Sequence, residues 1–211
     1  MSVLNENTII GASAAGEYEI EQSLRFDDSA YLLRTPSVAS NRRTWTWSGW
    51  VKLNVNNSDN RTLFSASNPS NTGHMIRVYE NQFEILGYNS GWSYQLRTDQ
   101  LFRDPSAWYH IVAAIDTTQS TASNRVKMYI NGEQVTSFDA ETYPSQNFET
   151  FVNTTNEHYL GVAPYSDGIS EYFDGYLAEV NFIDGQALTP DSFGETGDYG
   201  EWKPIVYDGT Y

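Results

Sequence analysis

The chain consists largely of short runs of strand-forming residues, and this pattern limits its fold more than any other feature. Clusters of Asn, Asp, Gly and Ser separate the runs from Ser23 onward. Many short strands with turn signals between them are typical of a β-sandwich or barrel and argue against alternating βαβ units. The expected strands are Leu24–Phe26, Tyr31–Arg34, Thr44–Leu53, Thr62–Ala66, Met75–Tyr79, Phe83–Leu86, Ser93–Leu96, Trp108–Asp116, Val126–Ile130, Gln134–Phe138, Tyr159–Val162 and Tyr172–Ile183.

Turn and helix signals refine this expectation. The pair Asn131-Gly132 between two runs predicts a tight β-hairpin. The segment Val78–Phe83 predicts a second tight reversal. The best helix signal is Thr189-Pro190-Asp191, with Thr189 as the N-cap, and it has room for about one turn.

The length of 211 residues suits one larger all-β domain with flanking segments. Residues 1–22 are expected to form an N-terminal arm, because the small residues Gly11–Gly16 separate the first apolar residues from the first strand. Two interpretations of this arm stay open, a flexible linker and a segment that orders against a partner. Residues 23–193 are the expected domain and residues 194–211 a C-terminal tail.

The charge of the chain is distributed unevenly. Residues 1–130 carry eleven Lys/Arg and twelve Asp/Glu, whereas residues 131–211 carry only Lys203 against fifteen acids. A chain with this balance lacks the basic surface that binding to nucleic acid or to an anionic membrane requires. The acids are expected in loops 139–157, 165–174 and 184–201, where a shared rim would attract calcium or a basic partner.

Several other classes of protein are disfavoured. The sequence contains no cysteine, so it has no disulfide, thiolate metal site or cysteine nucleophile. The longest apolar run, Ile111–Ile115, is far shorter than a membrane-spanning helix. The N-terminus lacks the basic and apolar regions of a signal peptide, which predicts synthesis in a cytoplasm.

The order of the motifs resembles laminin-G-like domains of the concanavalin A-type superfamily. The motifs are Ser23–Tyr31, Thr44–Lys52, Leu63–Ser65, Trp108–Asp116, Val126–Gly132, Phe173–Val180 and Ala187–Thr189. This resemblance implies an all-β fold, an antiparallel jelly-roll β-sandwich. It does not imply one function, since the fold carries lectins, enzymes and adhesion modules.

A narrower resemblance concerns the two ends of the chain. Segments 3–13 and 193–204 resemble structural proteins of marine tailed bacteriophages. This implies a non-enzymatic virion protein, such as an appendage, fibre or capsid-decorating module, in a multi-copy assembly with other virion proteins. Two alternatives stay open: a purely architectural virion protein without a ligand, and a glycan depolymerase.

Catalytic patterns are missing from the sequence. Glucanases of this superfamily are expected to carry Glu-x-Asp-x-x-Glu on one strand, so that both carboxylates face one cleft. The chain lacks this motif, and its acidic clusters Glu171–Asp174 and Asp139–Glu141 have other spacings. The three histidines are isolated from one another, and His110 is expected to be a hydrogen-bonded strand residue.

Calcium is the metal that the abundant oxygen ligands would suit best. The candidate ligands are Asp167, Glu171 and Asp174, which flank Gly168 in an acidic loop. The alternative is that these acids are simply solvated. Two departures from the family pattern weigh against calcium: Asp28 replaces a usual glycine, and Ala178 replaces a potential carboxylate.

Glycan binding requires exposed aromatic rings beside amide and hydroxyl groups. The stretch Tyr88–Tyr94 has this composition, and its Asn-Ser-Gly turn is expected to place Tyr88, Trp92 and Tyr94 near a rim. Tyr165 and Asp167 form a second such stretch. The alternative for all of these rings is packing over loop backbone.

Overall fold

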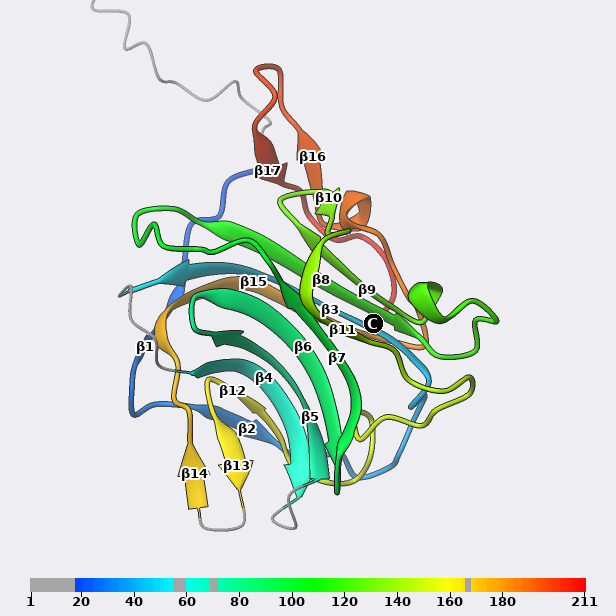
Figure 1. Ribbon diagram of the computed structural model, residues 1–211. Helices are drawn as coiled ribbons and strands as arrows, with labels where there is room; N and C mark the ends of the chain where they lie inside the picture. Colours follow the sequence, from blue (N-terminus) through cyan, green and yellow to red (C-terminus); the bar gives the residue numbers. More distant parts are fainter. Residues whose placement is uncertain (1–17, 55–59, 69–71, 166–167) are drawn as a thin grey trace, which may run out of the picture.

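The computed structural model describes residues 18–54, 60–68, 72–165 and 168–211, which form two large antiparallel sheets packed face to face (Figure 1). This arrangement confirms the expected jelly-roll β-sandwich. Within the described residues the only helical elements are two single 3₁₀ turns, η1 (Ala122–Asn124) and η2 (Pro190–Ser192). The described part of the chain therefore also has no helix long and apolar enough to cross a membrane.

The strands divide into two large sheets and two small hairpins. The back sheet has the order β1 (Leu24–Asp27), β15 (Asp174–Asp184), β3 (Thr44–Leu53), β8 (Tyr109–Asp116), β9 (Val126–Ile130) and β10 (Glu133–Gln134). The front sheet has the order β11 (Phe138–Thr142), β7 (Trp92–Thr98), β6 (Gln82–Asn89), β5 (Thr72–Tyr79), β4 (Arg61–Asn68), β12 (His158–Leu160) and β2 (Leu32–Arg34). The hairpins are β13 (Ala163–Tyr165) with β14 (Gly168–Ser170), and β16 (Gly194–Thr196) with β17 (Trp202–Pro204).

Both tight turns predicted from the sequence are present. Asn131 and Gly132 join β9 to β10 with φ angles of +49° and +85°. Glu80 and Asn81 join β5 to β6 with φ angles of +49° and +68°. Positive φ at both central residues matches the right-handed twist of the flanking strands. The helical turn after Thr189 is also present, although the Thr189 side chain forms no cap hydrogen bond.

The core lies between the two sheets and is rich in aromatic rings. Trp45 and Trp47 both point inward from β3, with 1% and 0% of their surface exposed, as their spacing of two residues requires. The Trp45 indole Nε1–H donates to Thr150 Oγ1 at 3.0 Å, so the ring is fixed at both its apolar and its polar ends. Trp50 points to the opposite face of the same strand.

The structure differs from the expected strands in three places. The run Gln134–Phe138 is not one strand, because β10 belongs to the back sheet and β11 to the front sheet. The hairpins β13–β14 and β16–β17 were not predicted. Their strands have only three residues each and include Pro164 and Pro204, so they are too short to show an alternating pattern.

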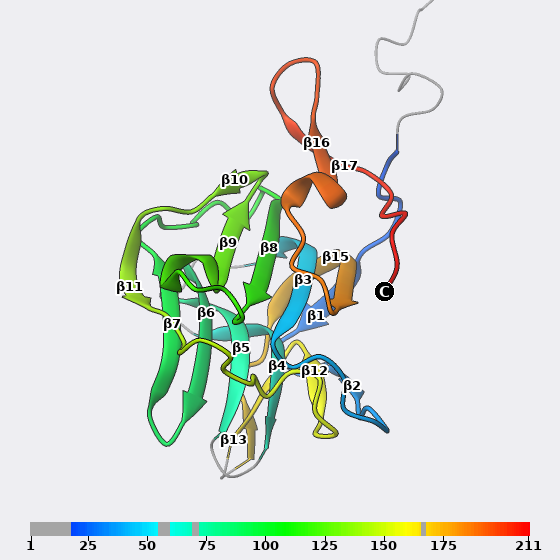
Figure 2. The same ribbon diagram turned by 90° about the vertical axis from the view of Figure 1, so that its right-hand side faces the viewer.

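A third layer covers the outer face of the back sheet. Phe193, together with the partly buried Leu188 and Tyr207, packs on Val112 and Ile183 of that sheet. This layer comes from the last part of the chain, which Figure 2 shows running along the side of β15 and β3. The back sheet is thus covered on both faces, whereas the front sheet has the core on only one.

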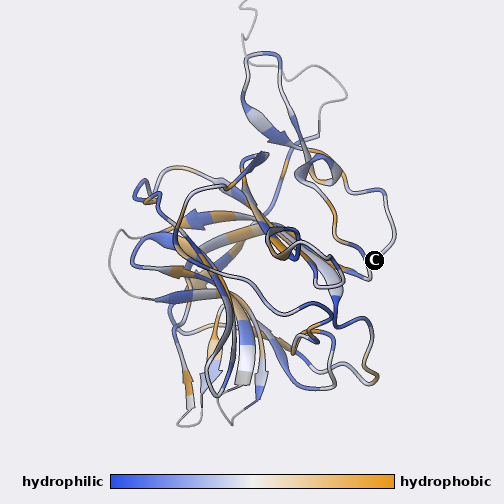
Figure 3. Ribbon diagram, turned by 45° about the vertical axis from the view of Figure 1, so that its right-hand side comes forward, coloured by the Kyte–Doolittle hydropathy of each residue, from blue (hydrophilic) through white to orange (hydrophobic). Residues whose placement is uncertain are grey.

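The front sheet is strongly curved. Figure 1 shows β4 to β7 as arcs that bend around the face turned away from β3, β8 and β15, with the β13–β14 hairpin lying against this hollow side. We call this the concave face. Figure 3 shows that hydrophobic residues concentrate in the strands, whereas the loop of the β16–β17 hairpin is hydrophilic.

Candidate ligand-binding site

The concave face carries a row of charged side chains that crosses neighbouring strands. Arg77 on β5 lies opposite Glu84 on β6, and Glu84 lies opposite Arg97 on β7. Residues directly opposite in an antiparallel sheet have their side chains on the same face, close enough to interact. The β-ladder therefore brings three charges into one line, and Asp139 of β11 continues it.

The charges in this row are paired. Arg77 Nε donates to Glu84 Oε2 at 2.7 Å, and Gln95 Nε2 donates to Glu84 Oε1 at 2.6 Å. Arg97 donates through Nε and Nη2 to Asp139 Oδ2 at 2.9 and 2.6 Å. Glu84 has no exposed surface, so the centre of this network is buried within the sheet.

Glu171 and Tyr79 complete the network. Arg77 Nη1 lies 3.0 Å from Glu171 Oε1, and the guanidinium groups of Arg77 and Arg97 lie 5.1 and 4.6 Å from the Tyr79 ring centre. Burial alone would lower the pKa of Arg77, but the carboxylates of Glu84 and Glu171 more than offset this and raise it. Arg77 therefore stays charged and holds two carboxylates in place.

An apolar patch lies next to the charged row. Met75 and Leu86 project from β5 and β6 and pack against Ala163 and Tyr165 of the β13–β14 hairpin. The Tyr165 hydroxyl donates to Met75 Sδ at 3.9 Å. Burial and the nearby Glu171 raise the pKa of Tyr165, so its hydroxyl stays protonated. Tyr165 is thus on the concave face, although half-buried.

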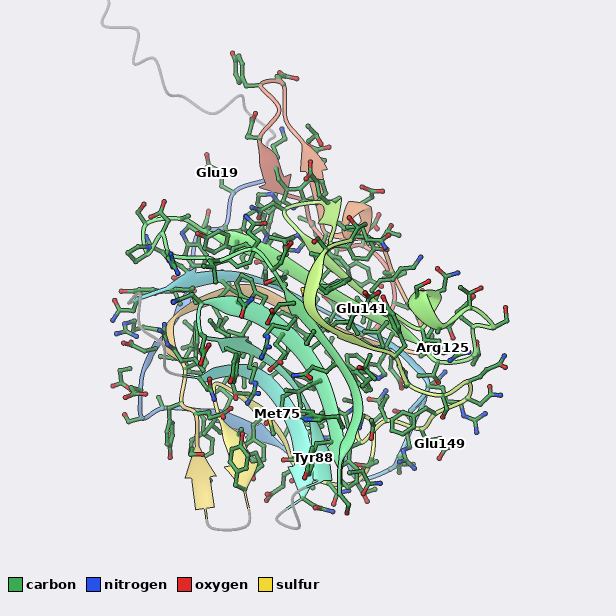
Figure 4. The ribbon with its side chains drawn as sticks, viewed as in Figure 1. Glu19, Met75, Tyr88, Arg125, Glu141 and Glu149 are labelled. Atoms are coloured by element: carbon green, nitrogen blue, oxygen red, sulfur yellow. The ribbon has the colours of Figure 1, made fainter. Side chains whose placement is uncertain are left out.

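Two further aromatic rings, those of Tyr88 and Trp92, lie at the end of the concave face next to the apolar patch. Trp92 is 54% exposed, and its ring meets that of Tyr88 edge to face at 5.4 Å and 82°. A register shift at Gly87/Tyr88 places Tyr88 opposite Trp92. Figure 4 shows Tyr88 and Met75 at the same end of the curved sheet. The expected position of Tyr88 and Trp92 near a rim agrees with this geometry.

Tyr94 is not at the rim, and here the sequence-based expectation is wrong. Its ring has no exposed surface, and its hydroxyl lies 2.7 Å from His74 Nδ1 inside the core. The β-bulge between Trp92 and Tyr94 explains the difference, since an extra residue turns Trp92 to the opposite face from Tyr94. Tyr94 therefore supports the site from below and cannot contact a ligand.

Of the candidate calcium ligands Asp167, Glu171 and Asp174, the structure describes the last two. Asp167 lies outside the described residues. Glu171 is held by Arg77, and Asp174 Oδ1 lies 2.7 Å from Arg25 Nη1. No group of three or more potential metal-ligating acids or histidines occurs among the described residues.

The acidic loops do not share one rim. Figure 1 shows the β13–β14 hairpin at the lower end of the molecule and the β16–β17 hairpin at the upper end. Strands from both halves of the sequence interleave in the sheets, so the charge asymmetry of the sequence is dispersed in space. The charged row was missed at the sequence level, although Arg77 and Glu84 inside otherwise apolar runs were its signal.

Comparison with known proteins identifies the fold. A laminin G-type family model, described as the concanavalin A-like lectin/glucanases superfamily, matches residues 26–192. None of the curated proteins matches the sequence.

Several solved structures share the architecture. The CBM40 of the Ruminococcus gnavus IT-sialidase bound to α2,3-sialyllactose has 13% identity and a TM-score of 0.58, with 81% of this chain and 94% of that chain covered. Domain 4 of the arabinanase AbnA from Geobacillus stearothermophilus, in complex with arabinotriose, has 21% identity and a TM-score of 0.58, with 80% and 73% covered. The binding domain of botulinum neurotoxin serotype D has 12% identity and a TM-score of 0.55, with 87% and 46% covered. At such identities the likeness shows the fold alone.

Proposed function

Because the chain belongs to the concanavalin A-like lectin/glucanase superfamily, we propose that it is a non-catalytic glycan-binding module whose ligand lies on the concave face. One observation carries the proposal: Trp92 is 54% exposed and packs edge to face on Tyr88, at the edge of a curved sheet lined with polar groups. Trp side chains are highly buried on average, and exposed apolar patches rimmed by polar groups mark ligand-binding or partner surfaces.

The chemistry of the face suits a saccharide. The C–H face of a sugar ring packs on an aromatic ring, and its hydroxyl groups pair with amide, guanidinium and carboxylate groups. Trp92 offers the ring, while Gln95, Arg97 and Asp139 offer partly exposed polar groups on the same face. The ion pairs between these groups hold them in position before a ligand arrives, which lowers the entropic cost of binding.

The acids of this face support binding more than hydrolysis. Glycosidases use two carboxylic groups that flank the scissile bond and are free to exchange protons with it. Here Glu84 is inaccessible and Glu171 and Asp139 are each paired with an arginine. Release of reducing sugar from glycans by the purified protein would overturn this part of the proposal.

A glycan array followed by calorimetry tests the binding site. The panel includes arabinan and sialylated oligosaccharides, since two structural neighbours were solved with such ligands. We expect Trp92→Ala to weaken binding about tenfold or more, as expected for loss of a stacked ring. Tyr199→Ala is the matched control, because Tyr199 is 97% exposed on the distant β16–β17 hairpin. A blank array, or equal loss in both variants, would count against the concave-face site.

We further propose that the module is displayed on a bacteriophage virion, on the basis of the sequence resemblance of segments 3–13 and 193–204. The first segment lies outside the described residues, and the second contains the whole β16–β17 hairpin. Tyr199 at the tip of this projecting hairpin favours docking to another protein. If the protein is purely architectural, deletion of residues 1–22 or Tyr199→Ala will abolish virion incorporation while the glycan array stays blank.

A further inference from the structure

A groove lies where the β16–β17 hairpin meets the ends of β8, β9 and β10. Figure 1 shows this hairpin at the upper end of the molecule and the turn between β6 and β7, next to which Trp92 lies, at the lower end. Three indole rings line it, those of Trp50, Trp108 and Trp202. We call this groove the end groove.

The end groove has a volume of about 560 Å³. A smaller groove of about 360 Å³ lies on the other side of the same three rings, against residues 20–23. The rings therefore form a wall that a ligand can reach from two sides.

The wall is held rigidly. The Trp202 indole Nε1–H donates to His110 Nδ1 at 3.0 Å, and the two rings stack at 6.0 Å and 21°. His110 in turn stacks on Trp50 at 5.0 Å and 26°. A Cβ atom at Gly132 or Gly194 would lie 2.5 Å from the Trp202 ring, so only glycine leaves room for it. Rings fixed in this way lose little conformational entropy when a ligand binds.

The polar lining of the end groove carries hydrogen-bonding groups and negative charge. Asp99, Asn131, Glu133 and Gln134 line it, and no Lys, Arg or His is among its lining residues. Asn131 Oδ1 accepts from the His110 backbone N–H at 2.8 Å, and Asp99 accepts from the Ser137 hydroxyl. In the part of the chain that the structure describes, the side chains of Glu133 and Gln134 form no hydrogen bond with other protein groups. These groups are free to pair with hydroxyls, whereas an anionic ligand would be repelled.

We propose that the end groove binds a neutral saccharide unit, as a second site separate from the concave face. Trp108 is partly exposed and offers the stacking surface, while Asn131, Glu133 and Gln134 accept or donate hydrogen bonds to sugar hydroxyls. A proline-rich peptide is the competing ligand for an aromatic groove. It fits less well, because the Trp202 N–H that would donate to a peptide carbonyl is already bonded to His110.

The six tryptophans of the chain provide the test, because each indole N–H gives its own signal in an NMR spectrum of the ¹⁵N-labelled protein. The probes are maltose, cellobiose, lactose and arabinotriose, with 3′-sialyllactose and decaproline for comparison. We expect at least one neutral sugar to shift the Trp108 and Trp202 signals saturably, while those of the buried Trp45 and Trp47 stay fixed.

Two variants separate this site from the concave face. Trp108→Ala and Gln134→Ala are each expected to raise the dissociation constant at the end groove about tenfold, and Trp92→Ala to leave it unchanged. The proposal is overturned if no neutral sugar moves the Trp108 and Trp202 signals, if only decaproline does, or if sialyllactose binds there as tightly as lactose. A Trp92 signal that responds alone would support the concave-face site and refute this one.

Discussion

The buried ion pair between Arg77 and Glu84 gives the sharpest test of how the concave face is built. Glu84→Ala removes a carboxylate with no exposed surface that accepts hydrogen bonds from Arg77 at 2.7 Å and from Gln95 at 2.6 Å. Removing one partner of a buried pair usually costs about 3–5 kcal/mol, because the other charge is left buried. Arg77 keeps Glu171 at 3.0 Å, so we expect the lower end of this range.

Chemical and thermal denaturation measure this cost. A loss of about 3 kcal/mol corresponds to a fall in Tm of about 6–12 °C for a domain of this size. Asp139→Ala is the matched control in the same row, because its side chain is 49% exposed and pairs with Arg97. It should cost less than about 1 kcal/mol, as exposed ion pairs do. If the two variants are equally stable, the charged row does not hold the face together.

Three further predictions concern the third layer and the buried histidines. Trp202→Ala should cost about 2–3 kcal/mol and speed hydrogen exchange in β16 and β17, because the ring and its bond to His110 fix the hairpin. Gly132→Ala should cost more than about 1 kcal/mol in denaturation, since its φ is +85° and Trp202 fills the space, whereas Gly91→Ala, with open space around it, should be neutral. Burial lowers the pKa of His74 to about 3 and of His110 to about 4. The unfolded chain therefore binds more protons below pH 6.5, and Tm should fall as the pH is lowered from about 6.5 toward 4, a slope that His110→Asn should reduce.

The sequence predicted the sandwich because the longer strands show a clear alternation of inward-facing and outward-facing side chains. In β3, the inward Trp45 and Trp47 and the outward Trp50 follow directly from a period of two residues. The same rule fails for Trp92 and Tyr94, which are two residues apart but lie on opposite faces. A β-bulge depends on pairing with the neighbouring strand, so no pattern within β7 alone reveals it.

The candidate site was predicted only in part for a similar reason. The sequence named Tyr88, Trp92 and Tyr165 as glycan-binding candidates, and all three lie on the concave face. The charged row, however, depends on the register between β5, β6 and β7. The end groove depends on the β16–β17 hairpin folding back onto His110, a contact between residues 92 positions apart in the chain. Such contacts are set by tertiary packing and leave no local signal.

The third layer also holds the C-terminal end of the chain against the back sheet. Tyr211 donates to Asn181 at 2.8 Å, and Figure 2 shows the first described residues and the C-terminus on the side of the back sheet. Copies anchored to a common scaffold through this side would all turn their concave faces outward. A weak affinity at each face would then add up to strong avidity, with an effective concentration set by the spacing of the copies.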